Sequence, residues 1–369
     1  MKKYLGVILI ILVFICQGAC NSDKVGKDGY YKETNIKYVS NQNESAKIKN
    51  IILLIGDGMG ENHVKITSEY KATTPLDILK AEYRGLMDTN CLDNYVTDSG
   101  ASATAMATGV RTLYERIGID ADGNELKTFL DYAKENGLST GLLTTDNLFG
   151  ATPSGFSGHT TNRYLDEKII INQQIVSNID IMMGYGEAYY FEYAKKLQNN
   201  GWEYVNDRES VFAAKTDKIF AAFSTASKKK DQMPTLAEMT KKSIEVLSKN
   251  DNGFVLVVEE AYIDKEIGNG DIDAMMDRVV SLDKALRVAL NFMRSNDETL
   301  VIVLADHETG GLVIKDGTPD VSWITEPDKY HTNVKVPVYA FGTRSKIFDN
   351  CDILNSDIFD IIMDCLGLK

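Results

Sequence analysis

Acidic and histidine side chains follow three separate apolar runs of this sequence. They are Asp57 after residues 51–55 (IILLI), Glu259 after residues 254–258 (FVLVV), and Asp306 and His307 at the end of residues 300–305 (LVIVLA). Open α/β sheets bind ligands outside the carboxyl ends of their strands, so residues at three such ends can converge on one crevice. Clustered carboxylates are costly to bury unless a cation neutralises them. The pattern therefore indicates a metal site, although a single Asp after a strand is more often a turn residue or a helix cap.

A serine stands where a helix rich in small residues is expected to begin. Residues 98–105 read DSGASATA and open a helix that is predicted to end near Gly109. Backbone N–H groups and the helix dipole favour an anion at a helix N-terminus, and a metal can activate a serine hydroxyl there. Ser99 is therefore a candidate nucleophile. Taken alone, the same pattern is more typical of an N-cap serine in front of an Ala-rich helix.

Strand-like and helix-like segments alternate along the chain and must position these residues. Further short apolar runs, at residues 139–144 and 336–341, predict buried strands. Residues 236–247 and 272–293 have the apolar spacing of amphipathic helices. The alternation predicts an α/β fold with a mainly parallel sheet. Residues 180–230, rich in Tyr, Phe and Lys, are interpreted as an excursion that could cap the site.

The composition excludes some classes of partner. The 369 residues are 44% hydrophobic and 25% charged, a balance that suits one large α/β domain or two small ones. The formal net charge of −13 argues against nucleic-acid binding, because clusters of Lys and Arg bind phosphate backbones. The one run of three basic residues, 228–230, is interpreted as a solvated loop or helix end.

The first twenty residues predict export. Lys2 and Lys3 precede an apolar segment, residues 5–16, that is too short to span a bilayer as a stable helix. Residues 17–20 (QGAC) then resemble the lipobox of bacterial lipoproteins, which predicts a lipid on Cys20 and a membrane-anchored protein in the periplasm or on the cell surface. The alternative is an ordinary cleaved signal peptide that leaves Cys20 as a free thiol.

The rest of the chain is divided into a tether and a domain. Residues 21–49 are polar and rich in Lys, Asn and Ser, which is typical of a tether, and residues 50–369 form the predicted catalytic domain. Cys91, Cys351 and Cys365 are an odd number without CxxC spacing, so they indicate neither a disulfide framework nor a zinc knuckle. The sequence is compatible with a disulfide bond between Cys351 and Cys365.

Several blocks of sequence, read together, resemble one known family. They are residues 50–60 (NIILLIGDGMG), 96–112 (VTDSGASATAMATGVRT), 151–153 (ATP), 162–163 (NR), 258–259 (VE), 263–265 (IDK), 305–307 (ADH), 331–332 (HT) and 336–338 (VPV). In this order they resemble the alkaline phosphatase family over nearly the whole predicted domain. The resemblance implies a three-layer α/β sandwich with a large, mainly parallel central sheet flanked by helices, and small phosphorylated substrates. It also allows a homodimer.

The resemblance implies a role for each matched residue. Ser99 matches the nucleophile that forms a phosphoserine, Arg163 matches the arginine that binds two phosphate oxygens, and Asp98 matches its orienting partner. The matches to metal ligands fall into three sets. The zinc that activates the serine is matched by Asp57, Ser99, Asp306 and His307, and a second zinc, which activates water and stabilises the leaving oxygen, is matched by Asp264 and His331. The third site, usually magnesium, is matched by Asp57, Thr152 and Glu259.

Individual residues also have simpler interpretations. Without the resemblance, Thr152 could be a turn residue, Arg163 a surface residue and His331 a core histidine. His63 and His159 match no metal position and are interpreted as structural or surface residues.

Two positions depart from the family pattern. Gly268 stands four residues after Asp264, where the family has a histidine ligand of the second zinc, and Gly150 stands where it has Asp or His. The nearby side chains that could substitute for the histidine are Glu266, Asn269 and Asp271. A zinc site normally has at least three protein ligands, so we expect a weakened second zinc and either reduced activity or a different metal preference.

The sequence as a whole predicts metal-dependent hydrolysis of phosphate monoesters through a phosphoserine intermediate, with Zn²⁺ and Mg²⁺ as cofactors. The alternative is a non-catalytic phosphate- or metal-binding lipoprotein of the same fold. A related phosphodiesterase or sulfatase is disfavoured. Residues 99–103 (SGASA) lack the Cys/Ser-x-Pro-x-Arg stretch from which sulfatases generate their nucleophile.

Overall fold

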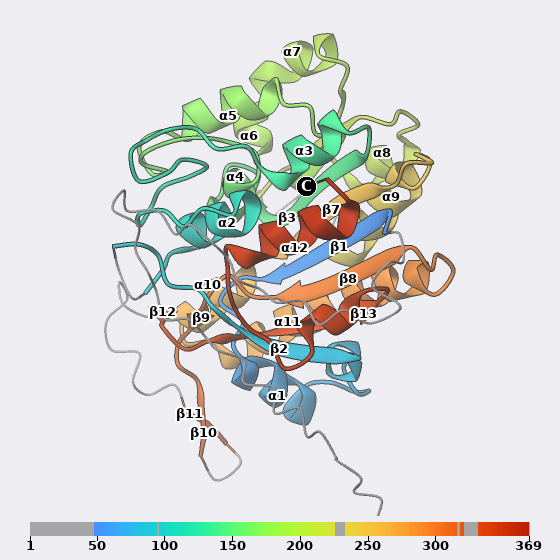
Figure 1. Ribbon diagram of the computed structural model, residues 1–369. Helices are drawn as coiled ribbons and strands as arrows, with labels where there is room; N and C mark the ends of the chain where they lie inside the picture. The colour runs from blue at the N-terminus through green and yellow to red at the C-terminus, as the bar shows by residue number, and fades with distance from the viewer. Residues whose placement is uncertain (1–47, 94–95, 226–232, 316–317, 321–330, 369) are drawn as a thin grey trace, which may run out of the picture. The chain divides into compact units, whose positions relative to one another are not determined.

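The computed structural model describes residues 48–93, 96–225, 233–315, 318–320 and 331–368 (Figure 1). All of these lie within one unit, Asn35–Lys369. The predicted signal peptide, nearly all of the predicted tether and the basic run at residues 228–230 are outside the described residues. No helix in the described part of the chain has the length and apolar character needed to cross a membrane.

A ten-stranded sheet forms the centre of this unit (Figure 1). Across the sheet, the strands are β14 (Asp352–Leu354), β2 (Tyr83–Asp88), β13 (Val336–Gly342), β8 (Thr299–Leu304), β1 (Asn50–Gly56), β7 (Phe254–Glu260), β3 (Ser139–Asn147), β4 (Ile181–Tyr185), β6 (Ile219–Phe223) and β5 (Glu203–Val205). Within this sheet, β13 is antiparallel to both neighbours, whereas all other pairs are parallel. The predicted mainly parallel sheet is therefore confirmed, and the five predicted strands correspond to β1, β3, β7, β8 and β13.

Helices cover both faces of the sheet, which explains its continuous apolar runs. Every residue of β1, β7 and β8 is buried. One face carries α1 (Glu61–Tyr70), α9 (Leu236–Leu247), α10 (Tyr262–Gly268) and α11 (Ile272–Met293), and the other carries α2 (Ser99–Thr108), α3 (Phe129–Glu135), α4 (Ala151–Gly155) and α12 (Asp357–Leu366). The predicted three-layer arrangement is confirmed.

The two predicted amphipathic helices agree with α9 and α11 residue for residue. Thr235 caps α9 in a capping box with Glu238, and Asp271 caps α11 by accepting a hydrogen bond from the Ala274 N–H. The apolar stripe of α11 faces the sheet and is buried, consistent with a packing role.

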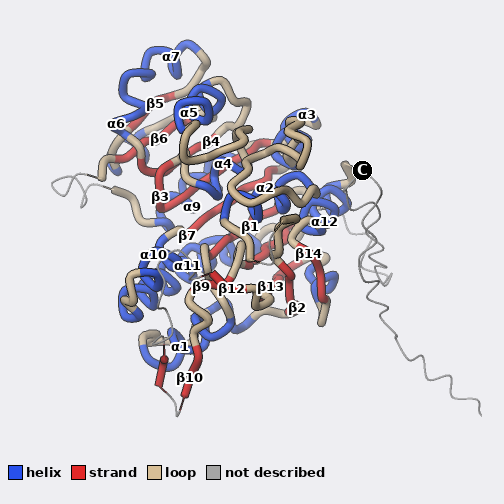
Figure 2. Tube along the Cα trace, turned by 90° about the vertical axis from the view of Figure 1, so that its left-hand side faces the viewer, coloured by secondary structure: helices blue, strands red, loops and turns tan. Residues whose placement is uncertain are grey.

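The interpretation of residues 180–230 as a cap is wrong for the described residues 180–225. They form β4, β6 and β5, which extend the central sheet at one edge (Figure 2). The strands have only three to five residues and lack long branched runs, so their sequences carry little strand signal. Aromatic packing holds them, with Phe220 in contact with Trp202, Tyr190 and Tyr204. The short helices in and before this segment are α5 (Glu167–Ile175), α6 (Glu187–Tyr190), α7 (Ala194–Asn199) and α8 (Arg208–Ala213).

Two small strand pairs lie outside the main sheet. The first pairs β10 (Val313–Lys315) with β11 (Thr318–Asp320), and the second pairs β9 (Glu308–Thr309) with β12 (His331–Thr332). The second pair places His331 opposite Thr309 and so beside the end of β8. Cys351 and Cys365 are free thiols, so the disulfide bond between them is not formed.

Close packing of α2 against α4 depends on a glycine. A Cβ atom at Gly155 would lie 2.6 Å from the Cβ of Ala103 and 3.0 Å from the backbone N of Thr104. Since α2 begins at Ser99 and α4 contains Thr152, this spacing also sets the distance between two candidate site residues.

We expect Gly155→Ala to lower the free energy of unfolding by about 1–3 kcal/mol, because backbone atoms of α2 cannot move aside cheaply. Gly158→Ala is the matched control, since a Cβ atom there would meet flexible side-chain atoms, the nearest 3.1 Å away on Gln173. Urea unfolding of both variants measures the difference. Equal losses would show that the contact between α2 and α4 has no special role.

Candidate active site

The register of three neighbouring strands brings the predicted acidic and histidine residues together. β1 lies between β7 and β8, and Ile55 pairs with both Glu259 and Leu304. The strands therefore end at the same edge, where the Nε2 atom of His307 lies 3.3 Å from Asp57 Oδ1 and 3.4 Å from Asp306 Oδ2. The predicted convergence of residues from separate apolar runs is observed.

Ser99 is the first residue of α2, and its hydroxyl faces this group. The N-cap of α2 is Asp98, whose carboxylate accepts hydrogen bonds from the Gly100 and Ala101 N–H groups. The interpretation of Ser99 as an N-cap is therefore wrong, and its side chain is free for other contacts. Ser99 Oγ lies 3.2 Å from His307 Nε2 and 3.5 Å from Asp57 Oδ1.

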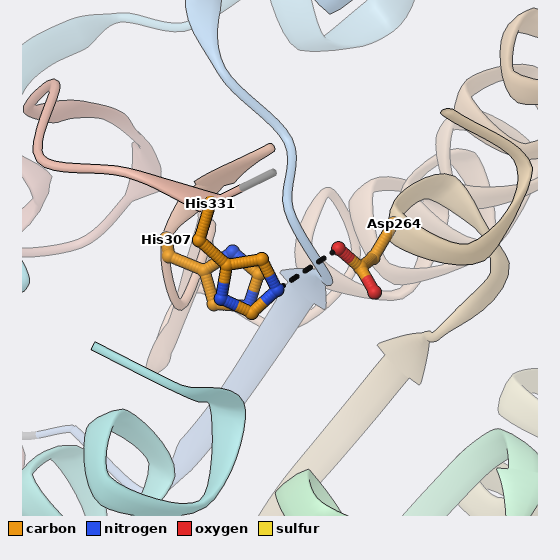
Figure 3. Close-up of side chains that lie close together, drawn as sticks. All are labelled: Asp264, His307 and His331. Atoms are coloured by element: carbon orange, nitrogen blue, oxygen red, sulfur yellow. Dashed lines mark ion pairs between the residues drawn. The ribbon is translucent and has the colours of Figure 1, made fainter. Parts of the chain in front are cut away.

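A second group lies beside the first. His331 Nε2 is 3.3 Å from Asp264 Oδ1, and the rings of His307 and His331 stack with centroids 3.6 Å apart (Figure 3). Asp264, His307 and His331 can each offer a ligand atom within 4.8 Å of the others, and so can Asp57, Asp306 and His307. His307 thus belongs to both candidate metal clusters.

The third predicted set is buried at the same edge of the sheet. Glu259 is 2% exposed and Thr152 is 1% exposed, and the Glu259 carboxylate accepts a hydrogen bond from Thr144 Oγ1. Within the described structure, the Thr152 hydroxyl and the Asp306 Oδ2 atom have no well-formed hydrogen bond. Buried oxygen atoms without hydrogen bonds usually have another partner, and a cation would supply one here.

Burial and mutual repulsion act on the pKa values of these carboxyl groups. Burial raises the pKa of Glu259 to about 8. Burial, together with the charges of Asp306, Asp264 and Glu259, raises the pKa of Asp57 well above its usual value. Burial acts in the same direction on Asp264, but in the metal-free protein the positive charges of protonated His331 and His307, together with hydrogen bonds from His331 and Thr309, outweigh it and lower the pKa of Asp264 to about 2. Carboxylates this crowded need a cation to ionise together, and their oxygen and nitrogen donors suit zinc and magnesium.

Arg163 lies where it could bind an anion brought to Ser99. Its Nε atom is 3.5 Å from Asp98 Oδ2, as the predicted pairing requires. Its guanidinium lies 4.6 Å from the centre of the Tyr164 ring, and Nη2 donates a hydrogen bond of 2.7 Å to the Tyr164 hydroxyl. Burial would lower the pKa of Arg163, but Asp98 raises it, so the group stays charged.

Ser99 and Arg163 line one cavity of about 890 Å³, together with Asp57, Thr152, Glu259, Asp264 and His331. The sequence did not point to several other lining residues. These are Tyr114, Glu115, Asp146, Asn147, Phe149, Tyr164 and Glu167. They belong to no recognisable motif, although Tyr164 directly follows Arg163.

The two departures from the family pattern have different surroundings. At Gly150, a Cβ atom would lie 3.0 Å from Asp146 Oδ2, and Asp146 forms an ion pair of 2.6 Å with Lys265. This pair thus occupies the space beside Gly150. Near Gly268, Glu266 pairs with Arg278 at 3.0 Å and Asp271 caps α11.

Glu266 and Asp271, two of the residues predicted as substitutes for the histidine, thus have other partners in the structure. Asn269 is an exposed residue at the end of α10. His63 and His159 fit the predicted structural roles. His63 accepts a hydrogen bond from the Gly60 N–H, and His159 Nε2 lies 2.9 Å from the Leu126 carbonyl oxygen.

Comparisons with known proteins agree with this geometry. The family described as "Alkaline phosphatase" matches residues 48–346. Alkaline phosphatase 4 of Bacillus subtilis (strain 168) is 32% identical over 317 residues, covering 79% of this chain and 68% of that protein. Alkaline phosphatase of Escherichia coli (strain K12) is 30% identical over 410 aligned positions, covering 87% of this chain and 86% of that protein. The structure of alkaline phosphatase from the Antarctic bacterium TAB5 matches with a TM-score of 0.77 and 27% identity, covering 87% of this chain and 98% of that chain, and a variant of it has Mg bound in a site called M3.

The raised pKa of Glu259 predicts how pH affects the metal-free protein. A carboxyl group whose pKa rises on folding binds more protons in the folded state, so stability falls as pH rises from its unfolded value near 4.5 to about 8. We expect metal-free Glu259→Gln, with a neutral amide, to lose less stability over this range than the wild-type protein.

Urea unfolding in the presence of a chelator, at several pH values between these limits, measures the slope. Glu61→Gln, which changes an exposed carboxylate, is the matched control and should follow the wild-type slope. A Glu259→Gln profile parallel to that of the wild-type protein would contradict the assignment.

Proposed function

This chain belongs to the alkaline phosphatase family and is a phosphomonoesterase, and we propose that it acts by double displacement with Ser99 as its nucleophile. One observation carries this proposal. The Ser99 hydroxyl lies 3.2 Å from His307 Nε2 and 3.5 Å from Asp57 Oδ1, in the wall of a cavity that Arg163 also lines.

The donor atoms of the site fit the metals that the family implies. Zinc would be held by Asp57, Asp306 and His307 beside Ser99, and a second zinc by Asp264 and His331. Magnesium would be held by Asp57, Thr152 and Glu259. When bound, these ions supply Lewis acidity, which favours ionised hydroxyl groups and neutralises charge on phosphoryl oxygens.

The residues of the chain then have separate tasks. Arg163, oriented by Asp98, binds two phosphoryl oxygens with its planar guanidinium. Ser99 Oγ gives its proton to solvent and attacks phosphorus, and the bond from phosphorus to the ester oxygen breaks as that oxygen takes up a proton from water and leaves as the alcohol. Water attacks the resulting phosphoserine, which releases phosphate and restores Ser99.

We also propose that the protein acts outside the cytoplasm, on small phosphate esters. The support is the N-terminal sequence, in which Lys2 and Lys3 precede an apolar segment and the QGAC tetrapeptide. In this proposal residues 1–20 are a lipoprotein signal, a lipid on Cys20 anchors the chain, residues 21–49 are a tether and residues 50–369 are the catalytic domain.

We expect Ser99→Ala to lower the turnover of an aryl phosphate by roughly a thousandfold or more, because the phosphoserine cannot form. The measurement is steady-state hydrolysis with added zinc and magnesium, using protein that lacks residues 1–20. Ser243→Ala is the matched control, since Ser243 is a buried serine of α9 without a hydrogen-bond partner in the described structure, and it should keep full activity.

If the wild-type protein binds phosphate but turns over no ester with any divalent metal, the proposed double displacement is wrong. That result would support the alternative, a phosphate- or metal-binding lipoprotein. Activity that survives in Ser99→Ala would instead contradict only the role of Ser99.

The second zinc is proposed to bind weakly. Asp264 and Gly268 are four residues apart on α10, so side chains at both positions would lie on one face of this helix. A histidine at position 268 could therefore complete the cluster, whereas glycine provides no ligand. Glu266 and Asp271 have other partners and do not compensate.

We expect the wild-type protein to retain fewer than two tightly bound zinc ions after prolonged dialysis, and Gly268→His to retain more. Metal analysis of the dialysed proteins measures the stoichiometry. Asn269→His is the matched control, because this exposed position points to a different side of the helix and should add no zinc. Two firmly held zinc ions in the wild-type protein would contradict the weakened site.

A further inference from the structure

A single threonine hydroxyl contacts one residue from each candidate metal cluster. Thr309 lies in β9 and is fully buried. Its Oγ1 atom is 2.6 Å from Asp264 Oδ1 and 3.2 Å from His307 Nδ1. Thr309 matches none of the family's metal or phosphate positions identified in the sequence, and it does not line the cavity.

The hydroxyl has only one proton, and this fixes the direction of both hydrogen bonds. An ionised carboxylate can only accept, so Thr309 donates its proton to Asp264. The imidazole of His307 must then donate from Nδ1 to the Thr309 oxygen. The His307 lone pair is therefore on Nε2, the nitrogen that lies 3.2 Å from Ser99 Oγ and 3.3 Å from Asp57 Oδ1.

His331 is oriented in a similar way by a different group. Its Nδ1 atom lies 3.0 Å from the Thr97 carbonyl oxygen, which can only accept a hydrogen bond. In neutral His331 the lone pair is therefore also on Nε2, the nitrogen that faces Asp264, and a metal ion between the two groups would accept it. A backbone carbonyl cannot be removed by substitution, but the Thr309 hydroxyl can, which makes the contact with His307 open to test.

The turn after Asp57 holds the Thr309 hydroxyl in place. The Thr309 N–H donates to the Gly58 carbonyl oxygen at 3.0 Å. Gly58 has a φ of +73°, and a Cβ atom there would lie 2.4 Å from Thr309 Oγ1. Only glycine leaves room for the hydroxyl, so the turn that presents Asp57 is fitted to Thr309.

We propose that Thr309 is a positioning residue that couples the two metal clusters through its hydroxyl. It directs His307 Nε2 toward Ser99 and fixes one oxygen of Asp264. The proposal rests on the metal sites of the proposed function. We expect the effect of Thr309 on the second cluster to be pronounced. Because Gly268 supplies no ligand there, metal binding depends more strongly on the orientation of Asp264.

The test is zinc affinity, measured by competition with a chromophoric chelator in the wild-type protein, Thr309→Val and Thr309→Ser. Valine keeps the shape of threonine without the hydroxyl, so we expect zinc affinity to fall by about 10–100-fold, as for other partners of metal ligands. Serine keeps the hydroxyl and should retain nearly wild-type affinity.

Thr240→Val is the control for loss of a buried hydroxyl elsewhere. Thr240 is fully buried in α9 and donates to the Leu236 carbonyl oxygen at 2.8 Å. This variant should keep its zinc affinity even where its melting temperature falls. If Thr309→Val does not fold, Thr309→Ser and Thr309→Ala form the deciding pair, since they differ only by the hydroxyl.

The outcomes separate this inference from the proposed function. Wild-type affinity in Thr309→Val, or equal losses in the valine and serine variants, would overturn the role of the hydroxyl and leave the proposed function standing. A wild-type protein that binds no zinc would overturn the proposed metal sites, and this inference with them.

Discussion

Four buried carboxylates at one edge of a parallel sheet are the constraint on which the rest of this structure depends. Asp57, Glu259, Asp264 and Asp306 are each 8% exposed or less, and burial with mutual repulsion raises the pKa of two of them, Asp57 and Glu259. Such a group is tolerable only with protons or cations bound. The paired register of β7, β1 and β8 fixes the positions of Glu259, Asp57 and Asp306. A shift along any of these strands would also expose its apolar residues to water. Packing of the apolar core thus keeps the carboxylates close together, and bound metal ions would neutralise their charge.

The two cations nearest these carboxylates in the cavity wall, Arg163 and Lys265, are each paired with another carboxylate. Arg163 is paired with Asp98, which also caps α2, so one carboxylate orients both the guanidinium and the helix that begins with Ser99. Lys265 is paired with Asp146, outside the two candidate metal clusters. The ion pairs of these two cations are thus made with carboxylates outside the candidate clusters. The arrangement keeps the carboxylates available for metals while a charged guanidinium remains in the wall of the same cavity.

The sequence predicted those parts of the fold and site that follow from local periodicity or strand ends. β1, β7 and β8 are long apolar runs and α11 has a clear stripe, so Asp57, Glu259 and Asp306 could be placed from residue types alone. The direction of β13 and the short strands β4, β5 and β6 depend on long-range pairing that leaves little local signal. Asp264, Arg163 and His331 were reached only through the family resemblance. The Thr309 hydroxyl could not be reached by either route, because its contact with Asp264 exists only once two separate segments have packed.

Shared side chains link the candidate metal sites to one another. His307 belongs to both candidate clusters, and Asp57 belongs to the first cluster and to the magnesium set inferred from the family. A change in any shared side chain therefore alters more than one site, which narrows the substitutions the fold can accept. Gly268 is different, because it lies one helical turn after Asp264 on α10 and belongs to neither candidate cluster. A ligand can be lost there while Asp57, His307 and Ser99 keep their mutual distances. The departure from the family pattern thus falls outside the side chains that contact the Ser99 hydroxyl.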